Sequence, residues 1–96
     1  MIEFKYDTQL LIEGNDLDKK KVTRYFDEKL KGDCLIVAQT GNLMKIHFHT
    51  NEPWFVLEYC STLGEIFDIV IEDMDRQSRG LHGLTFFRPF ALLFMQ

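Results

Sequence analysis

Hydrophobic and polar residues alternate near the start of the chain and change to helical spacing soon afterwards. Between residues 3 and 12 four apolar residues share one parity, namely Phe4, Tyr6, Leu10 and Ile12, with Thr8 as the weak member of the set. Lys5, Asp7 and Gln9 have the other parity, and this alternation is typical of a strand with one buried face. Apolar residues then recur at intervals of three and four, which predicts a helix through Val22, Tyr25, Phe26 and Leu30. Asp16 or Asp18 can accept hydrogen bonds from its first N–H groups.

Two further strands and a second helix follow. The stretches 34–40 and 43–49 are predicted as strands, and Gly41-Asn42 between them suits a tight hairpin turn. Thr50 or Asn51 is expected to cap a helix that begins near Pro53, because proline is tolerated in the first helical turn. The predicted inner stripe of this helix is Val56, Cys60 and Leu63.

A last strand and a short polar segment complete the pattern. The strand is predicted over residues 66–71 with alternate residues facing inward, namely Phe67, Ile69 and Ile71. The polar stretch 72–79 is expected to form a short helix or turn.

The order β-α-β-β-α-β predicts an α+β fold, a two-layer ferredoxin-like sandwich with an antiparallel sheet in the order 4-1-3-2 and both helices on one face. We expect the first and third strands to be central neighbours and to run parallel. Residues 1–80 form the predicted domain. The apolar tail, residues 81–96, is expected to dock on the sheet or on a second copy, or to bind a partner, because an exposed Phe-rich segment would aggregate.

Composition narrows the functional classes. The chain has 96 residues, of which 46% are hydrophobic and 27% charged, as in an ordinary globular domain. A net charge of −4 without a dense basic run argues against nucleic acid as a partner. Arg88 and Pro89 interrupt the apolar tail, so membrane insertion is not expected, and the missing signal peptide predicts a cytoplasmic location. Cys34 and Cys60 are expected to be buried free thiols.

The stretch "KIHFHTNEPW" carries the candidate chemistry. In the third strand, apolar residues alternate with Lys45, His47 and His49, so both imidazoles should point to the open face of the sheet. The same alternation sends Asp7 of the first strand to that face. Two imidazoles and a carboxylate suit zinc or a similar divalent metal, with one coordination position left open.

Other interpretations fit the same residues. The histidines can be solvated surface groups that bond to Asp7, or a pH-sensitive contact, since histidine titrates near neutrality. An enzyme would use a histidine as base with Cys34 or Thr8 as nucleophile, but the pattern supplies no oxyanion hole and no substrate pocket. Trp54 and Phe55 suit either a core or staple role at the helix start or an anchor for a partner.

Three stretches resemble the middle domain of bacterial fatty acid kinase A and of its dihydroxyacetone-kinase-like–DegV fusion relatives. They are "YDTQLLIEG", "GDCLIVAQTGNLMKIHFHTNEPWFVLEYCSTLGEI" and "IEDMDRQ", and the similarity runs from about Phe4 to Gln77. Its most specific parts are the Gly-Asp-x-Leu-x-Val motif at Gly32 and the His-x-His-Thr-Asn-x-Pro motif at His47.

The resemblance implies a linking role and a metal. In such proteins the central domain joins an ATP-binding domain to a region that engages a DegV-type fatty-acid-binding protein, and it helps to dimerise. It looks like a zinc binder that uses a cysteine in a Tyr-Cys-Thr motif and both histidines of His-x-His. The matching positions here are Asp7, His47 and His49. Asp7 departs from the pattern, because a hard oxygen replaces a soft thiolate, which should lower the affinity for zinc.

The expected function is therefore a non-catalytic assembly and dimerisation module, a homodimer with a possible metal site. Its expected partners are a kinase nucleotide-binding domain and a DegV-type protein. No Gly-rich phosphate loop and no magnesium-binding Asp cluster occur in the 96 residues, so no kinase activity is expected from them alone. The alternative is a stand-alone regulatory domain that binds a small ligand on the open face.

Overall fold

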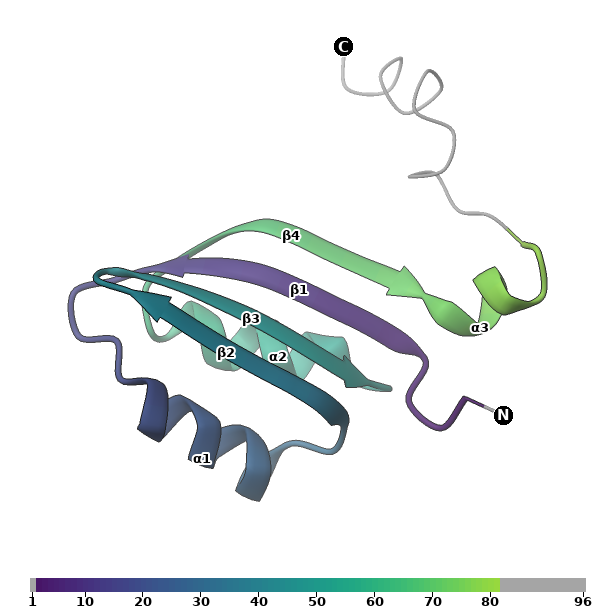
Figure 1. Ribbon diagram of the computed structural model, residues 1–96, viewed down its shortest axis with the longest axis horizontal. Coiled ribbons are helices and arrows are strands. Elements are labelled where there is room, and N and C mark those ends of the chain that lie inside the picture. Colours follow the sequence, from purple (N-terminus) through teal and green to yellow (C-terminus); the bar gives the residue numbers. More distant parts are fainter. Residues whose placement is uncertain (1, 82–96) are drawn as a thin grey trace, which may run out of the picture.

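A four-stranded sheet with helices against one face forms the body of the computed structural model, which describes residues 2–81 (Figure 1). The elements follow the predicted order β-α-β-β-α-β, with a short third helix where a polar helix or turn was expected. They are β1 (Tyr6–Glu13), α1 (Lys19–Lys29), β2 (Asp33–Thr40), β3 (Leu43–Thr50), α2 (Pro53–Ser61), β4 (Glu65–Asp73) and α3 (Met74–Ser78).

The sheet has the order β2-β3-β1-β4, which is the predicted 4-1-3-2 order counted from the other edge. All neighbouring strands are antiparallel, so the expectation that the first and third strands run parallel is wrong. The helix α1 returns the chain to the end where β1 began, and β2 therefore runs in the same direction as β1. The hairpin at Gly41, whose φ is +58°, reverses the chain again and sets β3 antiparallel to β1.

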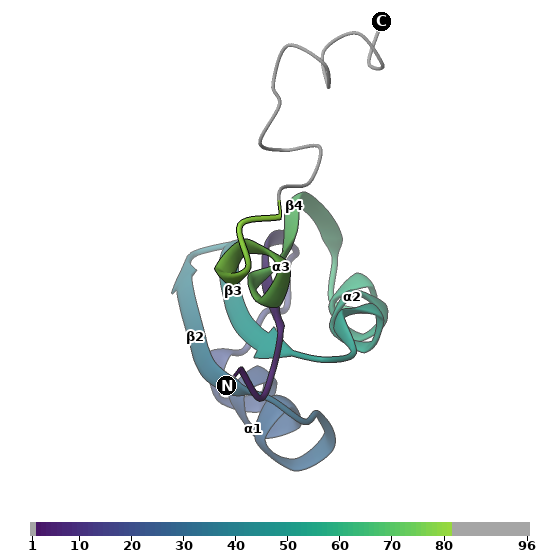
Figure 2. The same cartoon turned by 90° about the vertical axis from the view of Figure 1, so that its right-hand side faces the viewer.

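The core lies between the sheet and the two longer helices, which Figure 2 shows on the same side of the sheet. Phe26 of α1 meets Phe48 of β3 edge to face, with ring centroids 5.0 Å apart. Each fully buried side chain of this size contributes about 1.5–3 kcal/mol through loss of apolar surface to water. The buried set is Leu10, Ile12, Val22, Phe26, Val37, Met44, Ile46, Phe48, Val56 and Cys60.

The N-terminal cap of α1 was predicted correctly, and that of α2 was not. Asp18 caps α1 as predicted, because its carboxylate accepts from the N–H groups of Lys20 and Lys21 at 3.0 and 3.3 Å. α2 begins at Pro53 without a side-chain cap, so neither Thr50 nor Asn51 has the expected role.

Thr50 and Asn51 instead bond to two other segments, the connection between α1 and β2 and the residues before β1. The Thr50 hydroxyl donates to the carbonyl oxygen of Lys31 at 2.7 Å and accepts from the Glu52 N–H at 3.1 Å. Asn51 Oδ1 accepts from the Lys5 N–H at 2.9 Å. Both side chains thus hold the C-terminal end of β3, where the second histidine lies.

The last strand departs from simple alternation. Ile66 lies opposite Ile12 and packs against the core, whereas Phe67 lies opposite Leu11 on the open face. The register shifts in the next residues, where Asp68 has a φ of +51°. Ile69 and Ile71 are exposed, so the prediction that Phe67, Ile69 and Ile71 form a buried face is wrong.

Two further predictions concern the burial of single side chains. Both cysteines are free, but Cys34 is exposed and only Cys60 is buried. Trp54 and Phe55 are 56% and 44% exposed, which excludes the core role that was considered for them.

The expected docking of the apolar tail concerns residues that, from 82 onwards, lie outside the described part of the chain. Within residues 2–81, no helix has the length and apolar character required to cross a membrane.

Candidate metal centre

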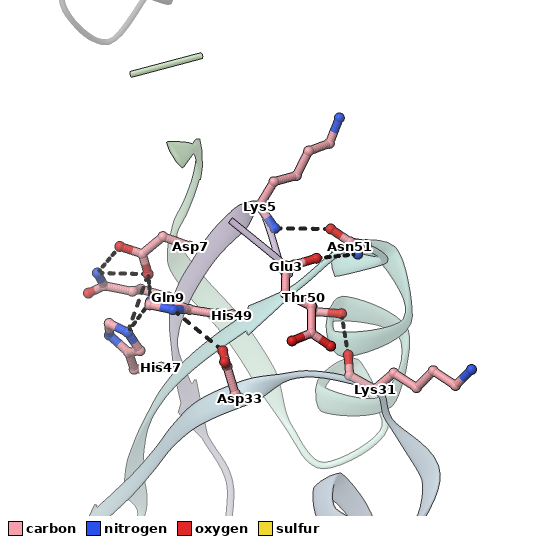
Figure 3. Close-up of polar contacts among 10 residues, drawn as sticks. All are labelled: Glu3, Lys5, Asp7, Gln9, Lys31, Asp33, His47, His49, Thr50 and Asn51. Carbon is pink, nitrogen blue, oxygen red and sulfur yellow. Dashed lines mark hydrogen bonds and ion pairs between the residues drawn. The ribbon is translucent and has the colours of Figure 1, made fainter. Parts of the chain in front are cut away.

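Strands β1 and β3 bring Asp7, His47 and His49 to the open face of the sheet (Figure 3). Asp7 pairs with His49 across the two strands, and the next residue of β1 on this face, Gln9, pairs with His47. The neighbouring residues of opposite parity on each strand are buried, namely Thr8 and Leu10 on β1 and Ile46, Phe48 and Thr50 on β3. Strand parity therefore places the three predicted residues together, as the alternation indicated.

Three atoms of these side chains converge. His47 Nε2 and His49 Nε2 are 3.0 Å apart. Asp7 Oδ1 lies 3.4 Å from His47 Nε2 and 3.7 Å from His49 Nε2. The side chains of the three residues are 21–23% exposed, so the cluster is half-buried but open to solvent.

Two polar neighbours complete the cluster, as Figure 3 shows. Gln9 Nε2 donates to Oδ1 and Oδ2 of Asp7 at 3.5 and 3.4 Å, which orients the carboxylate. Asp33 Oδ1 lies 3.7 Å from Nδ1 of His49, on the side of the ring away from Asp7. Asp33 is more exposed, at 57% of its side chain.

Sequence reasoning found the polar face of β1, which includes Gln9, but it missed Asp33. Simple alternation back from Ile36 puts Cys34, and not Asp33, on the open face. The observed register pairs Ile36 with His47 and Asp33 with His49, so β2 holds one extra residue there. The extra residue is Cys34, whose φ of +55° lies in the left-handed region. Glycine is the usual residue in that region, and the sequence "DCLIV" contains none, so the bulge could not be predicted from it.

The two residues considered as nucleophiles, Cys34 and Thr8, lie on different faces of the sheet. Asp33, Cys34 and His49 offer ligand atoms within 4.8 Å of one another, so Cys34 borders the cluster. Partial desolvation and then the Asp33 carboxylate raise the pKa of the Cys34 thiol above its usual value. Thr8 is fully buried on the opposite side of β1 and does not reach the open face.

The converging atoms have the chemistry and spacing of a metal-ligand set. Two imidazole nitrogens and one carboxylate oxygen are ordinary zinc ligands. A point in their plane that is equidistant from all three lies about 2.0 Å from each, close to the length of zinc–nitrogen and zinc–oxygen bonds. The three residues are thus a possible ligand group, and an ion bound there would link the two central strands.

Comparison with known proteins connects this chain to a family. Residues 3–81 match the family of fatty acid kinase A-like (FakA-like) middle domains. Protein YloV of Bacillus subtilis is 37% identical over 83 residues, which cover 79% of this chain and 14% of that protein. An uncharacterized protein of Staphylococcus haemolyticus, SH1689, is 30% identical over 86 residues, which cover 81% of this chain and 14% of its own length.

A second staphylococcal relative, the uncharacterized protein SSP1546 of Staphylococcus saprophyticus, is 29% identical over 80 residues, with 81% of this chain and 14% of that protein covered. The chain therefore spans only about one seventh of the length of these relatives.

Proposed function

This chain belongs to the family of FakA-like middle domains, and we propose on that basis that it is a non-catalytic assembly module of a fatty acid kinase-like protein. In this proposal Asp7, His47 and His49 bind one divalent metal ion, with zinc as the first candidate. Asp7 on β1 and the two histidines on β3 would hold the ion, and an ion held there would crosslink the two central strands and stabilise the module. The observation that carries the proposal is the triangle formed by the two Nε2 atoms and Asp7 Oδ1.

The donor set decides which ions suit the site. Imidazole nitrogen favours zinc and neighbouring transition metals, whereas calcium and magnesium prefer sites made of oxygen alone. Asp7 supplies an oxygen where a thiolate would bind zinc more tightly, so moderate affinity is expected. With three protein ligands, zinc bound there would crosslink β1 and β3 and would have one coordination position left for water or for a donor from another part of the protein.

Exposed apolar side chains support the assembly role. On the open face Ile36 is 57% and Val70 40% exposed, and on the first turn of α2 Trp54 is 56% exposed. Single exposed hydrophobic residues are common, but Trp54 and Phe55 lie side by side with ring centroids 6.1 Å apart. Aromatic residues are enriched at the centres of protein interfaces, so we assign this pair to contact with a neighbouring domain.

The partners follow from the same family membership. We propose that the module lies in the cytoplasm between a nucleotide-binding domain and a region that engages a DegV-type fatty-acid-binding protein, and that it contributes to a homodimer. A net charge of −4 is unfavourable for binding nucleic acid. The catalytic residues of such a protein would then lie outside this chain.

Two observations weigh against the other functions. The hollow on the open face beside Gln9, Lys45 and Val70 is about 200 Å³, below the roughly 300–1,000 Å³ of typical small-molecule sites, which disfavours a sensor that binds its ligand on this face. The raised pKa of Cys34 keeps it as a thiol near neutral pH, which disfavours its use as a nucleophile.

Metal analysis tests the metal site directly. The purified 96-residue chain is stripped with chelator, dialysed against zinc and analysed for bound metal beside the His47→Ala/His49→Ala variant. Lys45→Ala, an exposed change on the same strand and face, is the matched control. We expect about one equivalent of zinc in the wild type and the control and none in the double variant. Equal zinc contents in wild type and double variant would refute the site.

A binding measurement tests the assembly role. Calorimetry would compare the wild type with Trp54→Ser/Phe55→Ser in binding to the nucleotide-binding domain of the same kinase-like protein. Loss of the two aromatic side chains should weaken binding at least about tenfold, since interface aromatics often contribute 2 kcal/mol or more. Ile69→Ser, an exposed apolar residue on the edge strand β4, is the control. Equal affinities for all three chains would contradict the assignment of this surface.

A further inference from the structure

His49 lies between two carboxylates, one at each ring nitrogen. Its Nε2 atom is 3.7 Å from Asp7 Oδ1, and its Nδ1 atom is 3.7 Å from Asp33 Oδ1. Asp33 lies outside the triangle formed by Asp7 and the two histidines, so it is not one of the three proposed ligands. Figure 3 shows it on β2, beside the edge of the His49 ring that points away from His47.

The proton on the imidazole decides what each nitrogen can do. A neutral imidazole has one N–H donor and one nitrogen with a free lone pair, and an ionised carboxylate only accepts. If the proton were on Nε2 of His49, the lone pair of Nδ1 would face the Asp33 carboxylate and repel it. With the proton on Nδ1, the N–H points to Asp33, and the Nε2 lone pair faces His47 and Asp7.

The second histidine agrees with this arrangement. The 3.0 Å contact between the two Nε2 atoms requires a proton on one of them. If His49 accepts there, then His47 donates from Nε2, and this N–H also lies near Asp7 Oδ1 at 3.4 Å. In this arrangement an N–H faces a carboxylate oxygen at two of the three imidazole–carboxylate contacts, His47–Asp7 and His49–Asp33, and a lone pair faces one at the third, His49–Asp7. The opposite assignment would place an N–H at the His49–Asp7 contact alone, so the balance of contacts favours the Nδ1–H form of His49.

We propose that Asp33 is a positioning residue that holds His49 in the Nδ1–H tautomer and presents its Nε2 lone pair to the metal site. The inference deepens the proposed function, on which its metal consequence rests. His49 is then a ligand set in place before the metal arrives, while His47 must give up its Nε2 proton to bind. A carboxylate on the outer nitrogen of a ligating histidine is a common support in zinc sites.

A competing assignment for Asp33 is a second cation site with Cys34 and His49, whose ligand atoms also lie close together. That site would use the lone pair of Nδ1. A neutral ring cannot offer both lone pairs at once, so His49 would leave the cluster with Asp7 and His47. Asp7 is 22% exposed and Asp33 57%, and the more enclosed cluster with two imidazoles is the better metal site.

The backbone conformation of β2 places Asp33 next to His49. The extra residue at Cys34 shifts the register by one, which turns Asp33 to the open face directly opposite His49. A non-glycine residue in the left-handed region costs about 1–2 kcal/mol. The supporting carboxylate thus depends on a bulge that alternation along β2 would not provide.

The tautomers are measurable without any metal. Long-range ¹H–¹⁵N spectra of the histidine-labelled 96-residue chain, stripped of metal and held where both rings are neutral, report which nitrogen carries each proton. We expect the proton on Nδ1 for His49 and on Nε2 for His47. Asp33→Ala should shift a large part of His49 to the Nε2–H form, and Asp33→Glu should restore the wild-type state. Asp27→Ala, an exposed change of the same charge on α1, should change nothing.

The same four chains are then titrated with zinc against a competing chelator. Asp33→Ala should bind 10–100-fold more weakly than the wild type, with one equivalent in each. Wild-type tautomers and affinity in Asp33→Ala would overturn the inference, and so would a Glu variant that behaves like the Ala variant. A second zinc equivalent that Asp33→Ala loses would make Asp33 a ligand and also overturn it. If the wild type binds no zinc, the proposed metal site fails, and the metal-free spectra still decide the role of Asp33.

Discussion

Thr8 places a hydroxyl group in the core of the domain. Its hydroxyl is the buried side-chain polar atom without a hydrogen-bond partner in the described residues, and the side chain is fully buried. A buried polar group without a partner costs about 1–3 kcal/mol. Thr8 faces the core, directly behind the cluster on the other side of β1.

Replacing Thr8 with valine should therefore stabilise the protein. The methyl group of valine fills the same space without the desolvation cost of the hydroxyl, so the free energy of unfolding should rise by about 1 kcal/mol. Urea denaturation measures this change. Thr40→Val, the same substitution at an exposed position of β2, should stay within about 0.5 kcal/mol of the wild type. A clear loss of stability in Thr8→Val would mean that the hydroxyl has a partner.

The two thiols should react very differently. Burial raises the pKa of Cys60 to about 12, and partial desolvation with the Asp33 carboxylate also raises the pKa of the exposed Cys34. At pH 8 a thiol reagent should label only Cys34 in the native protein, and slowly, because the thiolate is the reactive form. Asp33→Asn removes the negative charge and lowers the pKa of Cys34, so labelling at pH 8 should become faster.

Mass spectrometry after timed labelling checks both statements, and labelling in denaturant confirms that two thiols are present. Native labelling of Cys60, or a slower reaction of Cys34 in Asp33→Asn, would contradict the described environments.

At the residue scale the sequence alone predicted the cluster but not its support. Alternation along two strands is enough to put Asp7, His47 and His49 on one face, because a strand has a period of two and the other face must be buried. Asp33 escaped the same reasoning because the extra residue at Cys34 reverses the parity of what precedes it. A bulge without glycine leaves no mark in the pattern of apolar residues.

At the scale of elements, the junction between α1 and β2 passes close over β3. A Cβ atom on Gly32 would overlap the carbonyl oxygen of His49 and the ring of Phe48. The absence of a side chain at Gly32 therefore lets the chain pass close to the backbone of β3, the strand that carries the histidines. Gly41, in the hairpin turn, differs: its φ is +58°, and a Cβ atom there would meet nothing within 4 Å.

These two glycines give a matched pair of substitutions. Gly32→Ala should lower the free energy of unfolding by about 3 kcal/mol, because the overlapped atoms include backbone that cannot move aside. Gly41→Ala should cost only about 1 kcal/mol, from the left-handed backbone alone. Chemical denaturation compares them. The close approach would be refuted if Gly32→Ala were no more destabilising than Gly41→Ala.

The order and type of the elements were predictable because periods of two and of three to four are well separated in this chain. The direction of the third strand was predicted wrongly, although the helical crossover and the hairpin together determine it. The face of β4 was also predicted wrongly, since Asp68 interrupts the strand with a left-handed residue and shifts the register. Capping at Thr50 was predicted wrongly because Thr50 is the last residue of β3, and Glu52 occupies the N-cap position of α2. The Thr50 hydroxyl donates to Lys31 instead, a contact between residues far apart in sequence.

At the scale of the whole molecule, the domain is a sandwich of one sheet and two helices whose second sheet face has no helix over it within the described residues. The candidate metal cluster lies on that face and joins β1 to β3, the two central strands. An ion bound to folded but not to unfolded chain shifts the folding equilibrium toward the native state. Metal binding is therefore also a prediction about global stability.

Zinc should raise the stability of the wild type and leave that of His47→Ala/His49→Ala unchanged. At a free zinc concentration 100 times the dissociation constant, the free energy of unfolding should increase by about 2.7 kcal/mol. Thermal denaturation with and without zinc measures the shift. Magnesium at the same concentration is the control ion, because it prefers oxygen ligands. Equal shifts for both ions, or for both chains, would speak against the cluster.

We propose that strand parity assembles one metal site from Asp7, His47 and His49. The most direct test is a crystal structure of the zinc-loaded chain with anomalous diffraction data at the zinc absorption edge. We expect one zinc ion bound by Nε2 of both histidines and by a carboxylate oxygen of Asp7, at about 2.0–2.2 Å. A zinc ion bound elsewhere, or one held by Cys34 and Asp33 without His47, would contradict it.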